Sequence, residues 1–194
     1  MKLKITGGIQ KGRFIDAPKG SSTRPTSEKL RKTFFDILRD RVENAIVIDF
    51  FAGSGAVGIE ALSRGAATAY FIDNDHHAIA TIHHNLKMLD FVRNACVYKL
   101  DGLKAVGILL EKGVQADVIF IDPPYAKEAG PQGLGERLIG LIDRSPILKQ
   151  GGLILLEEGR YFDEARCNTQ LTSLRLMSKR GSTDTSLYLY EKII

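Results

Sequence analysis

From residue 44 onward, short apolar runs alternate with segments whose apolar positions recur at helical spacing. The runs are rich in β-branched residues and hold few polar ones, as in strands that are buried on both faces. Five strands are predicted in this way, over residues 45–51, 68–72, 95–100, 117–121 and 153–156. Helices are predicted after the first four of them, over residues 56–62, 75–89, 103–110 and 133–142. This order of elements is typical of an α/β fold with a doubly wound, mostly parallel sheet.

The two ends of the chain follow other patterns. Residues 171–177 and 185–190 are predicted to form an antiparallel hairpin, which brings the sheet to about seven strands. Near the start, an alternating segment to Thr6, a turn at Gly7 and Gly8, and a return through residues 13–15 predict a smaller hairpin.

A helix is then expected from about Ser27 to Arg41. We therefore expect an extension over residues 1–43, made of the small hairpin and this helix, and one domain over residues 44–194.

The first strand of the core ends in a glycine-rich turn, Asp49-x-Phe51-x-Gly53-x-Gly55. A strand, a glycine turn and a helix form the first crossover of nucleotide-binding α/β folds, because glycine lets a ligand approach the backbone. Gly58 completes a dinucleotide fingerprint, and Asp73 lies where a ribose-binding acid is expected. An acid before the glycines would repel a pyrophosphate but attract the cationic end of S-adenosylmethionine (SAM), so SAM is the preferred cofactor. A crossover turn that binds nothing is the alternative.

Acids also end the other strands of the core, at Asp73, Asp101 and Asp122. The carboxyl ends of parallel strands form the ligand crevice of such a sheet, so these acids and Asp49 are expected to converge. Asp73 is predicted to accept the two ribose hydroxyls of an adenosine, and Asp101 its amino group. A surface turn or a helix cap is the alternative for Asp101. The predicted cofactor contacts are Asp49, Phe51, Gly53, Gly55, Asp73, Asn74, Asp101 and Gly102.

The sequence Asp122-Pro123-Pro124-Tyr125 is the most specific chemical signal in the chain. Neither proline has an amide hydrogen, so the turn is rigid. The Asp122 carboxylate and the Pro123 carbonyl are able to accept both hydrogens of one planar amino group, while Tyr125 stacks on the base that carries it. This arrangement would orient the nitrogen lone pair toward a methyl donor and stabilise the positive charge that develops there. Asp122, Pro123 and Tyr125 are therefore the predicted catalytic residues.

Charge is distributed unevenly along the chain. The net charge is +4, but residues 1–41 hold 11 Lys or Arg against 4 Asp or Glu, so this part carries +7 and the remainder −3. Such an asymmetry indicates a polyanionic partner, and a solvated surface is the alternative reading. The predicted substrate contacts are Lys11, Arg13, Arg24, Thr26 and Tyr125.

Other features narrow the class of protein. The two cysteines, Cys96 and Cys167, have neither disulfide nor zinc spacing. The four histidines recur at i and i+7 on one helix, which favours a solvated face over a metal site. No apolar run approaches the length of a membrane span. We expect a cytoplasmic monomer that binds no metal and no membrane.

Taken together, these motifs resemble the bacterial 16S rRNA guanine-N2 methyltransferases of the RsmD type. The resemblance runs from Gly7-Gly8 and Lys11-Gly12-Arg13, through Arg24-Pro25-Thr26 and the run from Asp49 to Gly65, to Asp122-Pro-Pro-Tyr125. It implies a class I SAM-dependent methyltransferase (Rossmann-like) fold and methylation of guanine 966 of small-subunit rRNA, within an assembly particle. This chain departs from the family pattern at two places. Glutamate is expected where this chain has Asp73, and an aromatic-Gly pair is expected where it has Ser182-Thr183.

Three other functions stay open on the sequence alone. A DNA or RNA adenine-N6 methyltransferase would share the Asp-Pro-Pro-Tyr sequence. A non-catalytic RNA-binding protein would share the fold, although the motifs at all four strand ends are intact. An NAD-dependent oxidoreductase would share the glycine turn but would need a hydride-transfer site, which no motif here resembles.

Overall fold

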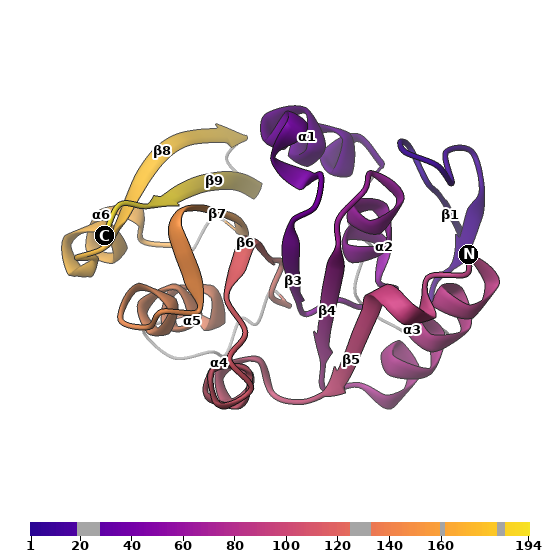
Figure 1. Ribbon diagram of the computed structural model, residues 1–194. Coiled ribbons are helices and arrows are strands. Elements are labelled where there is room, and N and C mark those ends of the chain that lie inside the picture. Colours follow the sequence, from indigo (N-terminus) through magenta and orange to yellow (C-terminus); the bar gives the residue numbers. More distant parts are fainter. Residues whose placement is uncertain (19–27, 125–132, 160–161, 182–184) are drawn as a thin grey trace. The chain divides into compact units, whose positions relative to one another are not determined.

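The computed structural model describes residues 1–18, 28–124, 133–159, 162–181 and 185–194 (Figure 1). The chain divides into two compact units, residues 1–101 and residues 102–194. This division differs from the predicted boundary near residue 43, which stays a prediction. Within the described ranges, no helix combines the length and the apolar character that crossing a bilayer requires.

The first unit contains three parallel strands in the order β5-β4-β3 (Figure 1). They are β3 (Ile46–Phe50), β4 (Thr68–Asp73) and β5 (Ala95–Lys99). Helix α2 (Ala56–Ser63) connects β3 to β4, and α3 (His76–Met88) and the 3-10 turn η2 (Val92–Asn94) lead on to β5. Val47, Ile48 and Phe50 are fully buried, as the continuous apolar run of β3 predicts.

The predicted N-terminal hairpin and helix are confirmed and belong to this first unit. Strands β1 (Lys2–Lys4) and β2 (Phe14–Asp16) pair antiparallel. Helix α1 (Glu28–Leu38) is followed by the 3-10 turn η1 (Arg39–Val42). Three apolar residues of α1 are buried on one face, Phe34, Phe35 and Leu38.

The second unit has the strand order β6-β7-β9-β8. The strands are β6 (Ala116–Ile121), β7 (Leu148–Gly159), β8 (Leu174–Gly181) and β9 (Thr185–Lys192). β6 and β7 are parallel, whereas β9 runs antiparallel to both β7 and β8, so the predicted closing hairpin is confirmed. The helices are α4 (Gly102–Glu111), α5 (Leu134–Asp143) and α6 (Glu164–Gln170).

The structure corrects two element predictions in the second unit. β7 begins at Leu148 instead of residue 153, because Gly151, at a φ of 73°, continues the strand through an irregular stretch that the sequence marks as a turn. The strand expected from residue 171 begins only at Leu174, because the backbone N–H groups of Thr172 and Ser173 donate to the carboxylate of Asp143 instead of to a neighbouring strand. α6 has seven residues, too few for a periodic apolar pattern to be visible.

Candidate active site

The turn after β3 is held open by left-handed backbone and by a buried carboxylate. Phe51, Gly53 and Gly55 have φ angles of 61°, 55° and 75°, which glycine adopts without strain and phenylalanine does not. Oδ2 of Asp49 accepts a hydrogen bond of 2.9 Å from the backbone N–H of Gly58, in the first turn of α2. Since no side chain of the preceding residues caps α2, Asp49 supplies the negative charge that the helix N-terminus favours.

Gly55 and Gly58 allow close packing against neighbouring side chains, whereas Gly53 has open space beside it. A Cβ on Gly58 would collide with the ring of Phe71 in β4, and one on Gly55 would lie 3.1 Å from Ile82. On Gly53, in contrast, an added Cβ would meet, among the described residues, only the carbonyl oxygen of Phe51, at 4.0 Å. The side chains of Phe71 and Ile82 therefore pack closely against the start of α2, while the Gly53 side of the turn is open to a ligand.

Asp73 ends β4 and reaches back to this turn. Its Oδ2 accepts the N–H of Gly53 at 2.8 Å, and its Oδ1 accepts the N–H of Asp75 at 2.9 Å. A carboxylate offers about four lone-pair positions, so both oxygens keep acceptor capacity. The predicted contact of Asp73 with a ribose is sterically and chemically compatible with these bonds, and it stays a prediction.

The predicted cofactor contacts Asn74 and Asp101 lie on the same edge of the first unit, and Gly102 begins the second unit. The backbone N–H of Leu100 donates to the carbonyl of Asp73 at 2.9 Å, which fixes Asp101 beyond the end of β5 next to the end of β4. Asn74 and Asp101 are exposed, and Gly102, the first residue of α4, is buried. The edge therefore presents an open glycine turn between carboxylates, a donor and acceptor set that fits the amino, ribose and sulfonium groups of SAM.

Asp122, Pro123 and Pro124 follow β6 in the second unit. The Asp122 residue is half-buried, Pro123 is buried and Pro124 is exposed. The predicted stacking residue Tyr125 lies outside the described residues. An acid and a carbonyl at the end of a buried strand are the acceptors that an amino group requires.

Sequence reasoning missed a second acid at this end of the second unit. Glu158 is half-buried near the end of β7, and it accepts backbone hydrogen bonds from Gly159 and Gly135. Burial raises the pKa of its carboxyl to about 7, and the negative charges of Asp122 and Glu136 act in the same direction. The sequence does contain a signal for Glu158, because Glu157-Glu158 ends an apolar run in the same way as the aspartates at the ends of the other core strands.

The predicted RNA contacts of the N-terminal part are placed only in part. Lys11 and Arg13 are exposed near the small hairpin. Arg13 also has a structural role, because its guanidinium donates to the carbonyl of Met88 and to Oε1 of Gln10, both at 3.0 Å. Arg24 and Thr26 lie outside the described residues, so their roles stay predictions.

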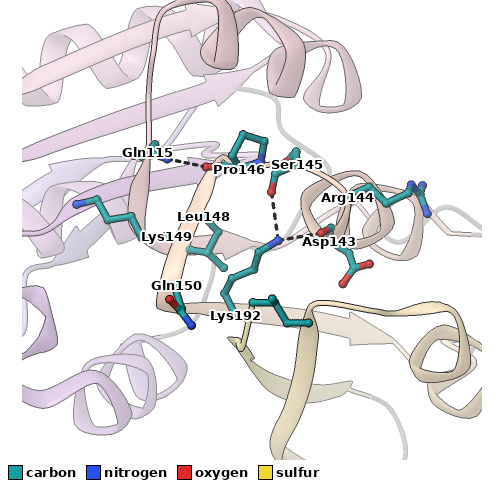
Figure 2. A pocket seen from close by; sticks show the side chains of 10 residues that line it. Gln115, Asp143, Arg144, Ser145, Pro146, Leu148, Lys149, Gln150 and Lys192 are labelled. Atoms are coloured by element: carbon teal, nitrogen blue, oxygen red, sulfur yellow. Dashed lines mark hydrogen bonds between the residues drawn. The ribbon is translucent and has the colours of Figure 1, made fainter.

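A separate hollow of about 400 Å³ is lined by Gln115, which directly precedes β6, whereas Asp122 follows the other end of that strand. Figure 2 shows the side chains that line the hollow. Figure 2 shows the amine of Lys192 pointing into the end of α5, where it donates to the carbonyls of Asp143 and Ser145 at 2.8 and 3.2 Å. A third bond of 2.7 Å goes to Oγ of Ser173. Because all three ammonium hydrogens have acceptors, Lys192 anchors the last strand to a helix C-terminus.

Comparisons with known proteins identify the family of this chain. The sequence profile of a family described as "Conserved hypothetical protein 95" matches residues 3–191. YlbH of Bacillus subtilis (strain 168), named as a candidate rRNA methyltransferase, is 36% identical over 190 residues, or 98% of this chain and 99% of that protein. Ribosomal RNA small subunit methyltransferase D of Escherichia coli (strain K12) is 35% identical over 156 residues, or 80% of this chain and 74% of that protein.

Solved structures show the same fold. The yhhF protein from Escherichia coli has a TM-score of 0.81 and 30% identity, and the alignment covers 100% of this chain and 99% of that one. SMU.776, solved with SAH, has a TM-score of 0.65 at 14% identity, over 80% of this chain and 48% of that one, which is a likeness of fold alone. The predicted class I SAM-dependent methyltransferase fold is confirmed.

Proposed function

The chain belongs to the RsmD family of bacterial small-subunit rRNA methyltransferases, and we propose that it methylates the exocyclic N2 amine of a guanine in 16S rRNA, with SAM as cofactor. By family resemblance the target is guanine 966. The observation that carries the proposal is the Asp122-Pro123-Pro124 turn at the carboxyl end of β6, in a chain whose glycine turn fits SAM.

The cofactor would be held by residues of the first unit. SAM supplies a methyl group that is activated by its positive sulfonium. The open side of Gly53 gives it room, and Asp73 and Asp101 offer carboxylates to its ribose and its adenine amino group. Asp49 acts from the inside, because its bond to Gly58 fixes the start of α2 and so the shape of the turn.

The substrate amine would be held by residues of the second unit. The Asp122 carboxylate and the Pro123 carbonyl accept its two hydrogens, which turns the lone pair outward and stabilises the charge that forms on nitrogen. The amine of guanine is a poor nucleophile because its lone pair is conjugated with the ring. Orientation and charge stabilisation are therefore the contributions that it most requires, and a strong base is not needed.

RNA docking is assigned to residues 1–41. A guanine N2 cannot reach a buried methyl group while it is stacked in a helix, so the base must be flipped out or unpaired. Holding RNA in that state requires phosphate contacts, and the net charge of +7 of residues 1–41 provides for them.

Identification of the product tests the proposal. The protein is incubated with labelled SAM and unmethylated 16S rRNA, free and in small subunits, and the RNA is digested to nucleosides. We expect label in N2-methylguanosine. Label in N6-methyladenosine would support the adenine alternative and reject the proposed function, and absence of label with RNA still bound would support a non-catalytic RNA-binding protein.

A further inference from the structure

Glu158 lies at the same edge of the second unit as Asp122, because β6 and β7 are neighbours. The two strands are parallel, with Ile121 opposite Leu156, so Asp122 follows one strand end and Glu158 lies near the next. The two carboxylates are close enough for the charge of Asp122 to disfavour ionisation of Glu158 and raise its pKa. A second acid therefore stands beside the acceptors assigned to the target amine.

The carboxylate of Glu158 is held in place by the start of α5. It accepts the backbone N–H of Gly135, and Gly133, the residue before the helix, makes no capping bond of its own. A Cβ on Gly135 would collide with Oε1 of Glu158 and lie 2.9 Å from Leu156, so only glycine admits the carboxylate here. Two of its acceptor positions are used by the amides of Gly135 and Gly159, which leaves capacity for a further donor.

Charged and titratable groups from three elements lie around Glu158. Asp122 follows β6, Glu136 belongs to α5 and Cys167 to α6. Glu136 is paired with Arg166 of α6, with Nη2 and Oε2 2.6 Å apart. Glu158 thus retains a proton at acidic pH, and its carboxylate, which is the stronger acceptor, forms as the pH rises through about 7.

Guanine and adenine differ in what they offer to such a second acceptor. Beside its amine, guanine carries the N1–H donor, so this edge presents three hydrogens. The adenine edge presents two, because its N1 carries a lone pair that a carboxylate repels. Asp122 and Pro123 account for two acceptors, which leaves one donor of guanine without a partner.

We propose that Glu158 accepts the N1–H of the target guanine and thereby selects guanine over bases that carry an amine without this donor. The inference rests on the proposed function, because it concerns the base held at Asp122. A site built around a substrate donor rejects analogues that lack it strongly, since the acceptor is then left buried without a partner. Glu158 becomes a specificity-determining residue that touches the substrate.

The test compares Glu158→Gln with wild type and with Glu111→Gln, which removes the same charge from an exposed position of α4 in the same unit. Glutamine keeps the size of the side chain and can still accept from Gly135, but it then turns its NH2 toward the N1–H. The substrates are RNA hairpins with guanine or 2-aminopurine at the methylated position, because 2-aminopurine has the amine but lacks the N1–H. kcat/KM is measured from pH 5.5 to 9, together with the affinity for SAM.

We expect kcat/KM of wild type with guanine to rise through about pH 7, as Glu158 ionises, and then to level off. Glu158→Gln should lack this rise, lose roughly tenfold to a hundredfold at pH 8.5, and lose most of the preference for guanine over 2-aminopurine. Glu111→Gln should behave as wild type, and SAM affinity should be equal in all three proteins.

Three outcomes would overturn the inference. One is a Glu158→Gln protein with the same pH profile and base preference as Glu111→Gln. Another is a loss of SAM affinity that accounts for the loss of activity. The third needs no variant: it is a wild-type pH profile that is the same with guanine and with 2-aminopurine, because only guanine carries the N1–H that Glu158 would accept. If wild type methylates guanine N2 and any of these occurs, the inference fails while the proposed function stands; if it methylates no guanine, both fail.

Discussion

Single atoms decide how the glycine turn is built. Gly58 lacks a Cβ because the ring of Phe71 occupies its place, whereas Gly53 lacks one although the space around it is open. The sequence pattern Gly-x-Gly-x-x-Gly does not distinguish its three positions. The reason why each position holds glycine becomes visible only in the structure, where the neighbouring strand packs against the turn.

Replacing Gly58 by alanine tests the packing role. Gly58→Ala should lower the free energy of unfolding by about 1–3 kcal/mol, the range for overfilling a packed core. Gly107→Ala is the matched control, since Gly107 lies in α4 and no atom of the residues that the structure describes is within 4 Å of its added Cβ. This control should raise the free energy of unfolding by about 0.5–1 kcal/mol. Denaturant titration measures both. A further substitution, Phe71→Leu, should recover part of the Gly58→Ala loss, and failure to do so would place the strain elsewhere.

Asp73 combines a structural and a binding role at one carboxylate. Asp73→Ala should weaken SAM binding by roughly 1.5–3 kcal/mol, the range for a lost charge-assisted hydrogen bond. It should also lower the free energy of unfolding by about 1 kcal/mol, because the N–H of Gly53 loses its acceptor. Calorimetric titration and denaturant unfolding separate the two effects, with Asp36→Ala on the exposed side of α1 as control. Unchanged SAM affinity would remove Asp73 from the ribose site.

Residue positions at the site were predictable where a local pattern encodes them. The end of β4 at Asp73 and the turn at Gly53 follow from short segments of sequence. The contact of Glu158 with the start of α5 was not predictable in this way. It joins residues that are 23 positions apart, and it is possible only because Gly135 has no side chain. Such a contact depends on the packing of helix on strand, which composition and spacing do not encode.

At the scale of elements, a buried carboxylate joins the N-terminal extension to the core. Glu60 of α2 is 1% exposed and is bonded by Arg31 of α1, at 3.4 Å, and by Arg64, at 2.9 Å. The hydroxyl of Thr6 also donates to it. Arg31 in turn donates to the carbonyl of Lys4 in β1 at 2.6 Å. The extension is thus fixed to α2 by charges that have been removed from water.

Breaking this network should loosen the extension. Arg31→Met should lower the free energy of unfolding by about 3 kcal/mol, because Glu60 stays buried with one cation fewer. Lys32→Met is the matched control, because Lys32 is the next residue of α1 and is exposed. Hydrogen exchange should quicken at the amides of Ile5 and Gly12, which are bonded within the hairpin. Equal stability of the two variants would show that apolar contacts of α1 alone hold the extension.

Elements were predictable in proportion to their length and periodicity. Strands β3, β4, β6 and β7 follow from apolar runs that contribute buried residues to the core, whereas β5 is only half-buried and follows from its place in the alternation of strands and helices. α6 was missed, although Asp163 accepts the N–H of Arg166 as a helix cap at 3.0 Å, because a two-turn helix leaves little periodic signal. The strand expected from residue 153 begins at Leu148, because β7 passes through Gly151 and Gly152.

At the scale of the whole molecule, charge separates the chain into a basic start and an acidic remainder. Of the cations in residues 1–41, Arg31 is buried and Arg13 donates to the carbonyl of Met88. Substituting either residue would disturb the fold as well as the charge, so neither suits a test of RNA binding. Lys4 and Lys11 are exposed and carry their charges into solvent. These two lysines are the better variables for a test of docking.

Salt dependence of RNA binding measures how many phosphates the protein contacts. Each contact adds about −0.7 to −0.9 to the slope of log affinity against log salt, because it releases condensed counterions. The double variant Lys4→Ala, Lys11→Ala should therefore flatten the slope by roughly one to two units, while SAM affinity stays the same. The control is Lys87→Ala, Arg93→Ala, which removes two exposed cations of the first unit from outside residues 1–41 and should leave the slope unchanged. If the first pair leaves the slope unchanged and RNA still binds, the tested lysines are only solvated surface; if both pairs flatten it equally, binding follows net charge and has no specific docking element.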